Sequence, residues 1–230
     1  MSCAPLVSCL MPTRGRRAWI PLAVRWFAQQ TYSQRELIVV DDGDDPIEAL
    51  LPADPAIRYL RLAGRHPVGV KRNQAAEAAR GELLAHWDDD DWFAPHRLEV
   101  QVAAMQDPRV DLCGLSTLLY HDLRDGRCWQ YRAPPGRAPW LSLLCYRRAL
   151  WQSHPHPDLV VGSDTAFVRS IPAALWSVLP NQDLNVCLVH DTNTSPKVMQ
   201  APRWQPVPRD RVQRIMGPDR AFYPHLAGPV

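Results

Sequence analysis

The sequence lacks any long apolar stretch, since no window approaches the roughly 18 uninterrupted apolar residues that a membrane-spanning helix requires. It also lacks a signal peptide, because Met1–Met11 is too short and no basic region precedes it. We therefore expect a cytoplasmic protein with no transmembrane segment, which could still associate peripherally with a membrane-bound partner.

The chain has almost no excess charge of either sign. It holds 26 Lys and Arg residues against 24 Asp and Glu residues, a formal net charge of +2. So small a charge argues against nucleic acid or an anionic membrane surface as the main partner. A hydrophobic fraction of 46% and a length of 230 residues suit one globular domain, with or without an appended arm. None of these numbers indicates an oligomeric state.

Paired cysteine motifs are absent as well. The six cysteines form no CxxC pair, and their even number is weak evidence for disulfides in a chain of this length. Cys9 and Cys187 lie inside apolar runs, where a free thiol behaves as a small hydrophobic side chain. We expect reduced cysteines and a reducing compartment.

Strand-like and helix-like segments alternate through the first half of the chain. Apolar runs that end at turn residues predict buried strands, and apolar residues every three or four positions predict helices. The expected strands are Leu6–Met11, Glu36–Val40, Ala56–Leu62 and Glu82–Trp87. The expected helices are Ala18–Gln29, Pro46–Leu51 and Val68–Arg80, the last with Gly81 as its C-terminal cap. A further helix is expected to have Pro95 in its first position. This alternation predicts an α/β fold with a mostly parallel central sheet and helices on both faces.

The second half is less regular. Leu112–His121 and Arg127–Arg132 flank an Asp-Gly turn and predict an appended β-hairpin. Strands are also expected at Leu141–Tyr146 and Asn185–His190, and helices at Asp164–Ile171 and Arg209–Met216. The simplest organisation is a single domain over residues 1–195, with a C-terminal arm over 196–230 that packs on it.

Polar side chains follow three of the expected strands. The first strand runs into Pro12-Thr13-Arg14, the second into Asp41-Asp42, and the fourth into Asp88 through Asp91. In open parallel sheets, ligands bind at the carboxyl ends of the strands. We therefore expect these three groups to share one region of the molecule.

The run of four aspartates is the strongest single signal. Near a strand end, residues two apart point the same way, so Asp88 and Asp90 could converge on one cation. Carboxylate oxygens suit Mg²⁺ or Mn²⁺, which keep positions open for substrate phosphates. The alternative is a solvated acidic turn whose last member, Asp91, caps the helix that begins near Pro95.

Two further groups allow two interpretations each. Asp41 and Asp42 are either a simple turn after a strand or carboxylates that accept hydrogen bonds from a base or ribose. Arg72 follows a glycine-containing loop and could present its forked donor to a diphosphate. The alternative for Arg72 is a solvated basic face of a helix.

These residues resemble family 2 glycosyltransferases with the GT-A fold. Val7–Thr13 is similar to the opening strand of that family, and Gln30-Thr31-Tyr32 with Glu36–Gly43 is similar to its QTY and EIIVVDDG motifs. Arg72-Asn73, Gly81-Glu82 and the segment from Asp88 to Leu98 resemble its RN, GE and LDxDDxxxPxRL motifs. Order and spacing agree over roughly residues 5 to 105, and the resemblance thins beyond residue 110.

The resemblance implies a nucleotide-binding half over residues 5–110, an acceptor half over 111–195, and a nucleoside-diphosphate sugar as donor. It implies a metal site for Mg²⁺ or Mn²⁺ at Asp88, Asp90 and His190. It implies that Asp164 is the catalytic base, although Ser163 stands where the family has a first acid. The implied donor-binding residues are Pro12, Thr13, Arg14, Asp41, Asp42, Arg72, Asn73, Asp88 and Asp89.

The implied reaction is metal-dependent transfer of a sugar, with inversion, to a saccharide or another hydroxyl acceptor. Three alternatives remain open. The loss of an acid at Ser163 allows a non-catalytic subunit that only binds nucleotide sugar. A sugar-phosphate nucleotidyltransferase has a related sheet, but its loop after the first strand is richer in glycine than Thr13–Arg17. Asp164 could also be a simple helix cap, and His190 an ordinary histidine at a strand end.

Overall fold

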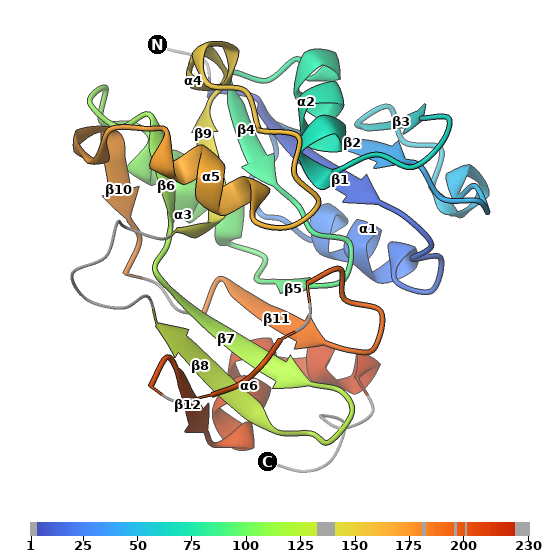
Figure 1. Cartoon of the computed structure of the whole chain (residues 1–230), viewed down its shortest axis with the longest axis vertical. Helices are drawn as coiled ribbons and strands as arrows, with labels where there is room; N and C mark the ends of the chain where they lie inside the picture. The colour runs from blue at the N-terminus through green and yellow to red at the C-terminus, as the bar shows by residue number, and fades with distance from the viewer. Residues whose placement is uncertain (1–3, 133–140, 181–182, 196, 201, 224–230) are drawn as a thin grey trace.

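A computed structural model of the whole chain describes residues 4–132, 141–180, 183–195, 197–200 and 202–223 and shows two β-sheets, one above the other in Figure 1. The larger sheet has seven strands, in the order β10 (Trp176–Val178), β6 (Leu112–Leu115), β9 (Ser142–Arg147), β4 (Leu83–His86), β1 (Val7–Thr13), β2 (Arg35–Asp41) and β3 (Ile57–Arg61). The second sheet has five strands, in the order β12 (Trp204–Val207), β8 (Cys128–Arg132), β7 (Thr117–Asp122), β11 (Asn185–Val189) and β5 (Trp92–Phe93).

The larger sheet is mixed, although its first half is parallel as expected. Strand β1 pairs in parallel with β2 and β4, β2 with β3, and β6 with β10. Strand β9 runs antiparallel between β4 and β6. The carboxyl ends of β1, β2 and β4 therefore lie at one edge, which is where the predicted polar groups follow them.

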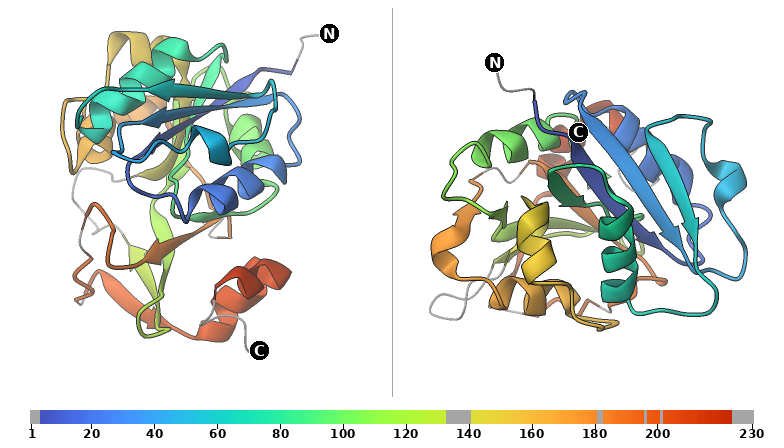
Figure 2. Two further views of the ribbon diagram at one scale, coloured as in Figure 1. Left: turned by 90° about the vertical axis from the view of Figure 1, so that its right-hand side faces the viewer. Right: turned by 90° about the horizontal axis from the view of Figure 1, so that it is seen from above.

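Helices cover both faces of the larger sheet (Figure 2). Helices α1 (Ile20–Ala28) and α3 (Arg97–Ala104) lie on one face, and α2 (Val68–Ala78), α4 (Arg148–Ser153) and α5 (Ser163–Arg169) lie on the other. Because side chains alternate across a strand, Cys9 and Met11 of β1 join the core under α1 and α3, and Leu10 joins the core under α2 and α5.

The predicted hairpin is present as β7 and β8, which pair antiparallel. Its first expected strand is divided, because Leu112–Leu115 joins the larger sheet and only Thr117–Asp122 enters the second sheet. The C-terminal arm supplies β12, which pairs with β8, and α6 (Arg209–Met216). Val212 and Met216 of α6 pack in the same core as α1.

Two boundary predictions were wrong. Helix α2 ends at Ala78, and its capping position is Ala79, so Gly81 is not its cap. A Cβ at Gly81 would lie 2.6 Å from the Leu6 carbonyl oxygen, so this position needs glycine for its close approach to β1. Helix α3 begins at Arg97, two residues after Pro95. The brief helix expected at Pro46–Leu51 is the 3₁₀ turn η1 (Glu48–Leu50), one of three with η2 (Ala173–Leu175) and η3 (Gly217–Phe222).

Within the described ranges, no helix combines the length and apolar character that crossing a bilayer requires. Five cysteines lie in the described part of the chain and have free thiols: Cys9, Cys113, Cys128, Cys145 and Cys187. Cys9 is buried, as expected of a small apolar side chain, and Cys187 is only partly buried.

Candidate active site

A cavity of about 400 Å³ opens at the carboxyl ends of β1 and β4. Segments from the whole length of the chain form its walls, including the aspartate run and the start of α5. Lining residues that enter the argument below are Pro12, Arg16, Arg72, Asp88, Asp89, Asp90, Asp91, Asp164, Asn193 and Lys197. The cavity thus contains carboxylates on two sides and three basic side chains.

Arg72 of α2 joins the two acidic sides of this cavity. Its Nη1 donates to Oδ1 of Asp164, and its Nη2 donates to Oδ1 of Asp88 at 3.2 Å. Burial raises the pKa of Asp164 above its ordinary value, and the Arg72 guanidinium opposes that rise. Asp164 is therefore a carboxylate with increased basicity, held in place by a buried cation.

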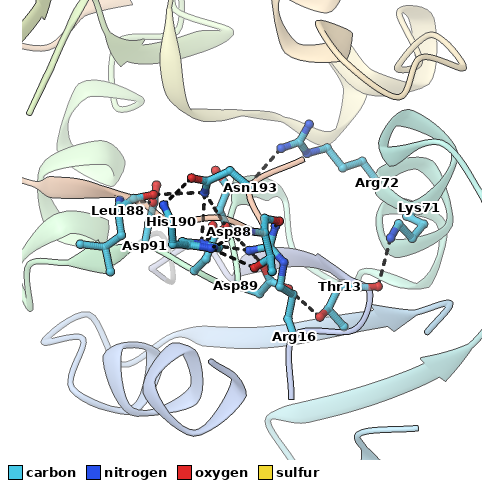
Figure 3. A network of polar contacts seen from close by, with 12 residues as sticks. Thr13, Arg16, Lys71, Arg72, Asp88, Asp89, Asp91, Leu188, His190 and Asn193 are labelled. Atoms are coloured by element: carbon cyan, nitrogen blue, oxygen red, sulfur yellow. Dashed lines mark hydrogen bonds and ion pairs between the residues drawn. The ribbon is translucent and has the colours of Figure 1, made fainter. Parts of the chain in front are cut away.

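Asp89 and Asp90 both lie within ion-pair distance of the Arg16 guanidinium. Figure 3 shows Asp89, Arg16 and Thr13 side by side. Oγ1 of Thr13 donates to Oδ2 of Asp89 at 2.6 Å, and Nη1 of Arg16 donates to Oδ2 of Asp90. Burial and the neighbouring Asp90 charge raise the pKa of Asp89 to about 7. Burial also opposes the charge on Asp90, but His190 and Arg16 outweigh it and lower its pKa.

His190 follows β11 and meets Asp90 from the second sheet. Its Nε2 lies 3.1 Å from Oδ2 of Asp90, and its ring stacks on Trp19 with 4.4 Å between centroids. Its Nδ1 lies 2.9 Å from Oγ1 of Thr192. The Thr192 backbone N–H also contacts Nδ1, at 3.3 Å, so Thr192 holds the ring with Nε2 next to Asp90, where this nitrogen could bind a cation.

Two of the three residues that the resemblance implies for a Mg²⁺ or Mn²⁺ site come together, whereas Asp88 does not join Asp90 and His190 in a three-ligand cluster among the described residues. Asp90 and His190 converge, with a carboxylate oxygen and an imidazole nitrogen as donors. Asp88 is half exposed at the same turn, bonded to Arg72. The Arg16 guanidinium lies between Asp90 and His190 and contacts both, so these two groups already have a positively charged partner within the protein.

Asp91 does not cap a helix, contrary to the alternative interpretation of the aspartate run. Its Oδ1 accepts the backbone N–H of Leu188 at 3.0 Å, and its Oδ2 accepts Nδ2 of Asn185 at 3.2 Å. The capping position of α3 is His96, whose side chain makes no capping bond. Asp91 therefore ties the aspartate turn to β11, and the turn is not a solvated acidic loop.

Asp41 and Asp42 have fully buried carboxylates with partners inside the protein. Asp41 accepts the Gly43 N–H at 2.8 Å and the Tyr59 hydroxyl at 2.9 Å. Asp42 accepts Nζ of Lys71 at 2.8 Å and the His66 N–H at 2.7 Å. Both aspartates order the loop after β2, and their predicted contact with a base or ribose stays a prediction.

Arg14 and Asn73 complete the predicted donor-binding set. Nη1 of Arg14 donates to the Asp42 carbonyl at 3.0 Å, and its side chain is one-third exposed. Asn73 is turned toward the segment after α4: its Oδ1 accepts the His156 N–H at 2.9 Å, and its Nδ2 donates to the His156 carbonyl at 2.8 Å. Asn73 thus fastens a loop next to the cavity, and its direct contact with a donor is likewise untested.

Sequence reasoning missed a buried cluster behind Asp164. The Tyr146 hydroxyl lies 2.9 Å from Nε2 of His156, and Nδ1 of His86 lies 3.8 Å from Oδ1 of Asp164. Burial, followed by the charge of Arg72, lowers the pKa of both histidines well below its ordinary value. Ligand atoms of His86, His156 and Asp164 are close enough to share a metal, but Arg72 places a positive charge on the same carboxylate oxygen.

Arg16, Thr192 and Asn193 were also missed as parts of the site. Nη2 of Arg16 donates to the Thr192 carbonyl at 2.6 Å, and Nδ2 of Asn193 lies 3.3 Å from Oδ2 of Asp90. These contacts link positions about 100 or more residues apart in the sequence. No periodicity or short motif carries that information, so only an alignment or a structure reveals them.

The solved structures that resemble this one are GT-A glycosyltransferases. Residues covering 84% of the chain superpose on 62% of the 1–349 segment of TarS from Staphylococcus aureus in complex with UDP-GlcNAc, with a TM-score of 0.64 and 20% identity. Residues covering 81% superpose on 57% of the mannosyltransferase PcManGT from Pyrobaculum calidifontis in complex with GDP-Man and Mn²⁺, with a TM-score of 0.61 and 19% identity. At these identities the likeness shows the fold alone, which is GT-A as predicted.

Curated relatives match a little under half of this chain. WcaA of Escherichia coli strain K12, provisionally named a colanic acid biosynthesis glycosyl transferase, is 36% identical over 107 residues, which cover 44% of this chain and 38% of WcaA. An uncharacterized glycosyltransferase of Rickettsia conorii is 30% identical over 105 residues, 44% of this chain and 17% of the relative. The chain thus spans well under half of these relatives.

One comparison covers both acidic sides of the cavity. The family model described as "Glycosyl transferase family 2" matches residues 8–171, which include β1, the aspartate run and Asp164. This match extends over more than two thirds of the chain and confirms the resemblance read from the motifs. The chain belongs to glycosyl transferase family 2.

Proposed function

We propose that this protein transfers a sugar from a nucleoside-diphosphate sugar to a hydroxyl group of an acceptor, with a divalent cation as cofactor and inversion at the anomeric carbon. The observation that carries the proposal is the single cavity in which Asp164 lies across from Asp88, with Arg72 between them. A general base and a phosphate-binding rim on opposite sides of one space are what an in-line displacement requires.

Asp164 is the proposed catalytic base. Its contacts with Arg72 and His86 both involve Oδ1, so within the described ranges Oδ2 is the oxygen available to an acceptor. Oδ2 takes the proton of the acceptor hydroxyl, the hydroxyl oxygen forms the new bond to the anomeric carbon, and the bond from that carbon to the diphosphate breaks. Attack from the side opposite the leaving group inverts the configuration.

The raised pKa of Asp164 supports this role. A carboxylate with an ordinary pKa is a weak base toward a sugar hydroxyl, and burial increases its basicity. The Arg72 guanidinium favours the ionised form of Asp164 and so limits this rise in pKa. Asp158, six residues earlier in the loop that leads into α5, is exposed and offers a comparison without these contacts.

Asp90, His190 and Asp88 are the proposed ligands of Mg²⁺ or Mn²⁺. A divalent ion supplies Lewis-acid stabilisation of the negative charge on the departing nucleoside diphosphate. Thr192 contacts the opposite ring nitrogen of His190 through its hydroxyl and its backbone N–H and fixes the orientation of the ring, and Trp19 packs on the ring face. Arg72 and Lys197 add positive charge to the cavity where the diphosphate would lie.

Neither the base nor the sugar of the donor follows from this cavity. Solved structures with the same fold hold UDP-GlcNAc in one case and GDP-Man with Mn²⁺ in another, which supports a uridine or guanosine diphosphate sugar. A panel of such donors, each tested with Mn²⁺ and with EDTA, should raise the melting temperature only for the correct donor and only with metal.

Slow donor hydrolysis in the absence of an acceptor separates an enzyme from a subunit that only binds nucleotide sugar. An active site with a working base and leaving-group stabilisation releases nucleoside diphosphate slowly to water, whereas a binding subunit does not. If the identified donor stabilises the protein but is neither hydrolysed nor transferred to any acceptor, the enzymatic proposal fails.

A further inference from the structure

Arg16 lies in the loop between β1 and α1, and only 7% of its surface is exposed. Its guanidinium donates to Asp90, lies 3.2 Å from Nε2 of His190, donates to the Thr192 carbonyl at 2.6 Å, and lies 3.9 Å from Asp89. Two carboxylates, an imidazole and a carbonyl oxygen are the groups that bind metal ions in proteins. Arg16 therefore occupies a binding site for a cation.

We propose that Arg16 is an internal competitor of the divalent ion: the metal binds Asp90 and His190 only when the Arg16 guanidinium leaves them. This inference rests on the proposed function, because it assumes that the metal uses these two residues. It adds a step that metal ligation alone does not require, namely displacement of a cation that the chain itself provides.

Competition follows from the atoms involved. Nη1 of Arg16 contacts both Oδ2 of Asp90 and Nε2 of His190, and these two atoms lie 3.1 Å from each other. A divalent ion would bond to the same two atoms at about 2.0–2.2 Å. A metal and a guanidinium on this one pair would be two cations within contact distance, in a buried place where water screens their repulsion poorly.

Displacement of Arg16 has a further consequence, because the guanidinium lines the same cavity as Arg72 and Lys197. A diphosphate in that cavity offers oxygens that match the fork of an arginine side chain. When the metal displaces Arg16 from Asp90 and His190, the phosphate oxygens of the donor become its hydrogen-bond partners. Metal and donor should then bind cooperatively, with Arg16 passing from Asp90 to the phosphates.

The test is the affinity of the whole protein for Mn²⁺ without nucleotide, measured from the electron paramagnetic resonance signal of free Mn²⁺. Arg16→Met removes the competing charge and keeps an unbranched side chain, and it should bind Mn²⁺ about tenfold more tightly than the wild type. Arg17→Met is the matched control, because Arg17 belongs to the same loop but contacts Asp45 and the Pro46 carbonyl. It should bind Mn²⁺ like the wild type.

Arg16→Met removes the basic partner of the buried Asp89 and Asp90 carboxylates, which puts its folding at risk. The experiment therefore includes a second variant. Arg16→Lys keeps a positive charge in the site and should bind Mn²⁺ no more tightly than the wild type, while circular dichroism reports whether each variant is folded. Equal or weaker Mn²⁺ binding by folded Arg16→Met, or tightening in Arg16→Lys as large as in Arg16→Met, overturns the competition.

Failure of the proposed function gives a different pattern. If neither the wild type nor Arg16→Met binds Mn²⁺, and sugar transfer proceeds equally well in EDTA, then both the metal site and the competition are wrong while glycosyl transfer stands. If Mn²⁺ binds both proteins equally and transfer requires it, only the competition is wrong.

Discussion

Three consecutive residues of α2 direct their side chains to three different places. Lys71 contacts Asp42, Arg72 contacts Asp164 and Asp88, and Asn73 contacts the backbone of His156. A helix turns by about 100° per residue, so neighbours in sequence cannot share one small site. Arg72 lines the cavity, whereas Asn73 bonds to the backbone of His156, and donor binding by either residue stays a prediction. The motif identifies the positions, and helical geometry sends their side chains in different directions.

Replacement of Asp164 by Asn tests the proposed base. The amide has nearly the same shape but cannot accept the proton, so we expect turnover to fall by about 10²–10⁴ while donor affinity is nearly unchanged. Asp158→Asn makes the same chemical change at an exposed position of the loop before α5 and should retain wild-type turnover. Full activity of Asp164→Asn in a coupled nucleoside-diphosphate assay would remove this residue from the mechanism.

Replacement of Asp90 by Asn tests the proposed metal ligand. Donor affinity measured by calorimetry should fall with Mn²⁺ present and change little in EDTA, because only the metal-mediated part of the binding is lost. Asp44→Asn is a suitable control, since the Asp44 side chain is almost fully exposed. A wild-type protein that binds its donor equally well with and without Mn²⁺ would contradict the metal assignment.

At the scale of elements, sequence reasoning succeeded where burial produces a strong pattern. Strands β1, β2 and β4 are buried along their whole length or all but their first residue, and each leads into a polar turn, so apolar runs identified them. It missed β5, β10 and β12, which have two to four residues and too few positions for a period to appear. Strand β12 also contains Pro206, which only an edge strand tolerates.

The contact between α2 and α5 provides a test at this scale. A Cβ on Gly69 of α2 would lie 1.9 Å from the Pro157 carbonyl oxygen and 2.9 Å from Oγ of Ser163. Gly69→Ala should therefore force α5 and Asp164 to shift, with a loss of roughly 1–3 kcal/mol in the free energy of unfolding and reduced turnover. Glu77→Ala, at an exposed position of the same helix, is the control in urea unfolding. Unchanged stability of Gly69→Ala would show that the two helices have room to separate.

At the scale of the whole molecule, one core connects the two sheets. Residues of α1, β2, β7, β11 and α6 belong to the same buried cluster. The arm therefore shares apolar contacts with the nucleotide-binding half, which the sequence could not show because these contacts are distant along the chain. We expect unfolding to be a single transition, with fluorescence and circular dichroism changing together.

The pH dependence of that transition should include a contribution from His156. Its pKa is lowered in the folded protein, first by burial and then by Arg72, so the unfolded chain binds a proton that the folded one does not. This contribution to stability is complete above the ordinary histidine pKa of about 6.5 and is lost as pH falls below it, by up to about 1.4 kcal/mol per pH unit. The His156→Gln variant lacks this pH-dependent contribution, so the free energy of unfolding should fall more in the wild type than in the variant as pH is lowered.

Urea unfolding at several pH values between about 5 and 8 measures this difference. His96→Gln serves as a control, because the His96 side chain is 44% exposed and lies away from Arg72. If the free energy of unfolding changes equally with pH in the wild type and in His156→Gln, then His156 does not remain neutral in the folded protein.

The pairing of β5 with β11 limits which changes in chain length the protein can accept. Only two residue pairs join these strands, Asn185 with Phe93 and Val186 with Trp92, yet they fix Asp90 opposite His190. One residue inserted between Asp88 and Trp92, or between Val186 and His190, would reverse the side on which the later residues point. Homologous sequences should therefore vary in length elsewhere and keep these two short segments free of gaps.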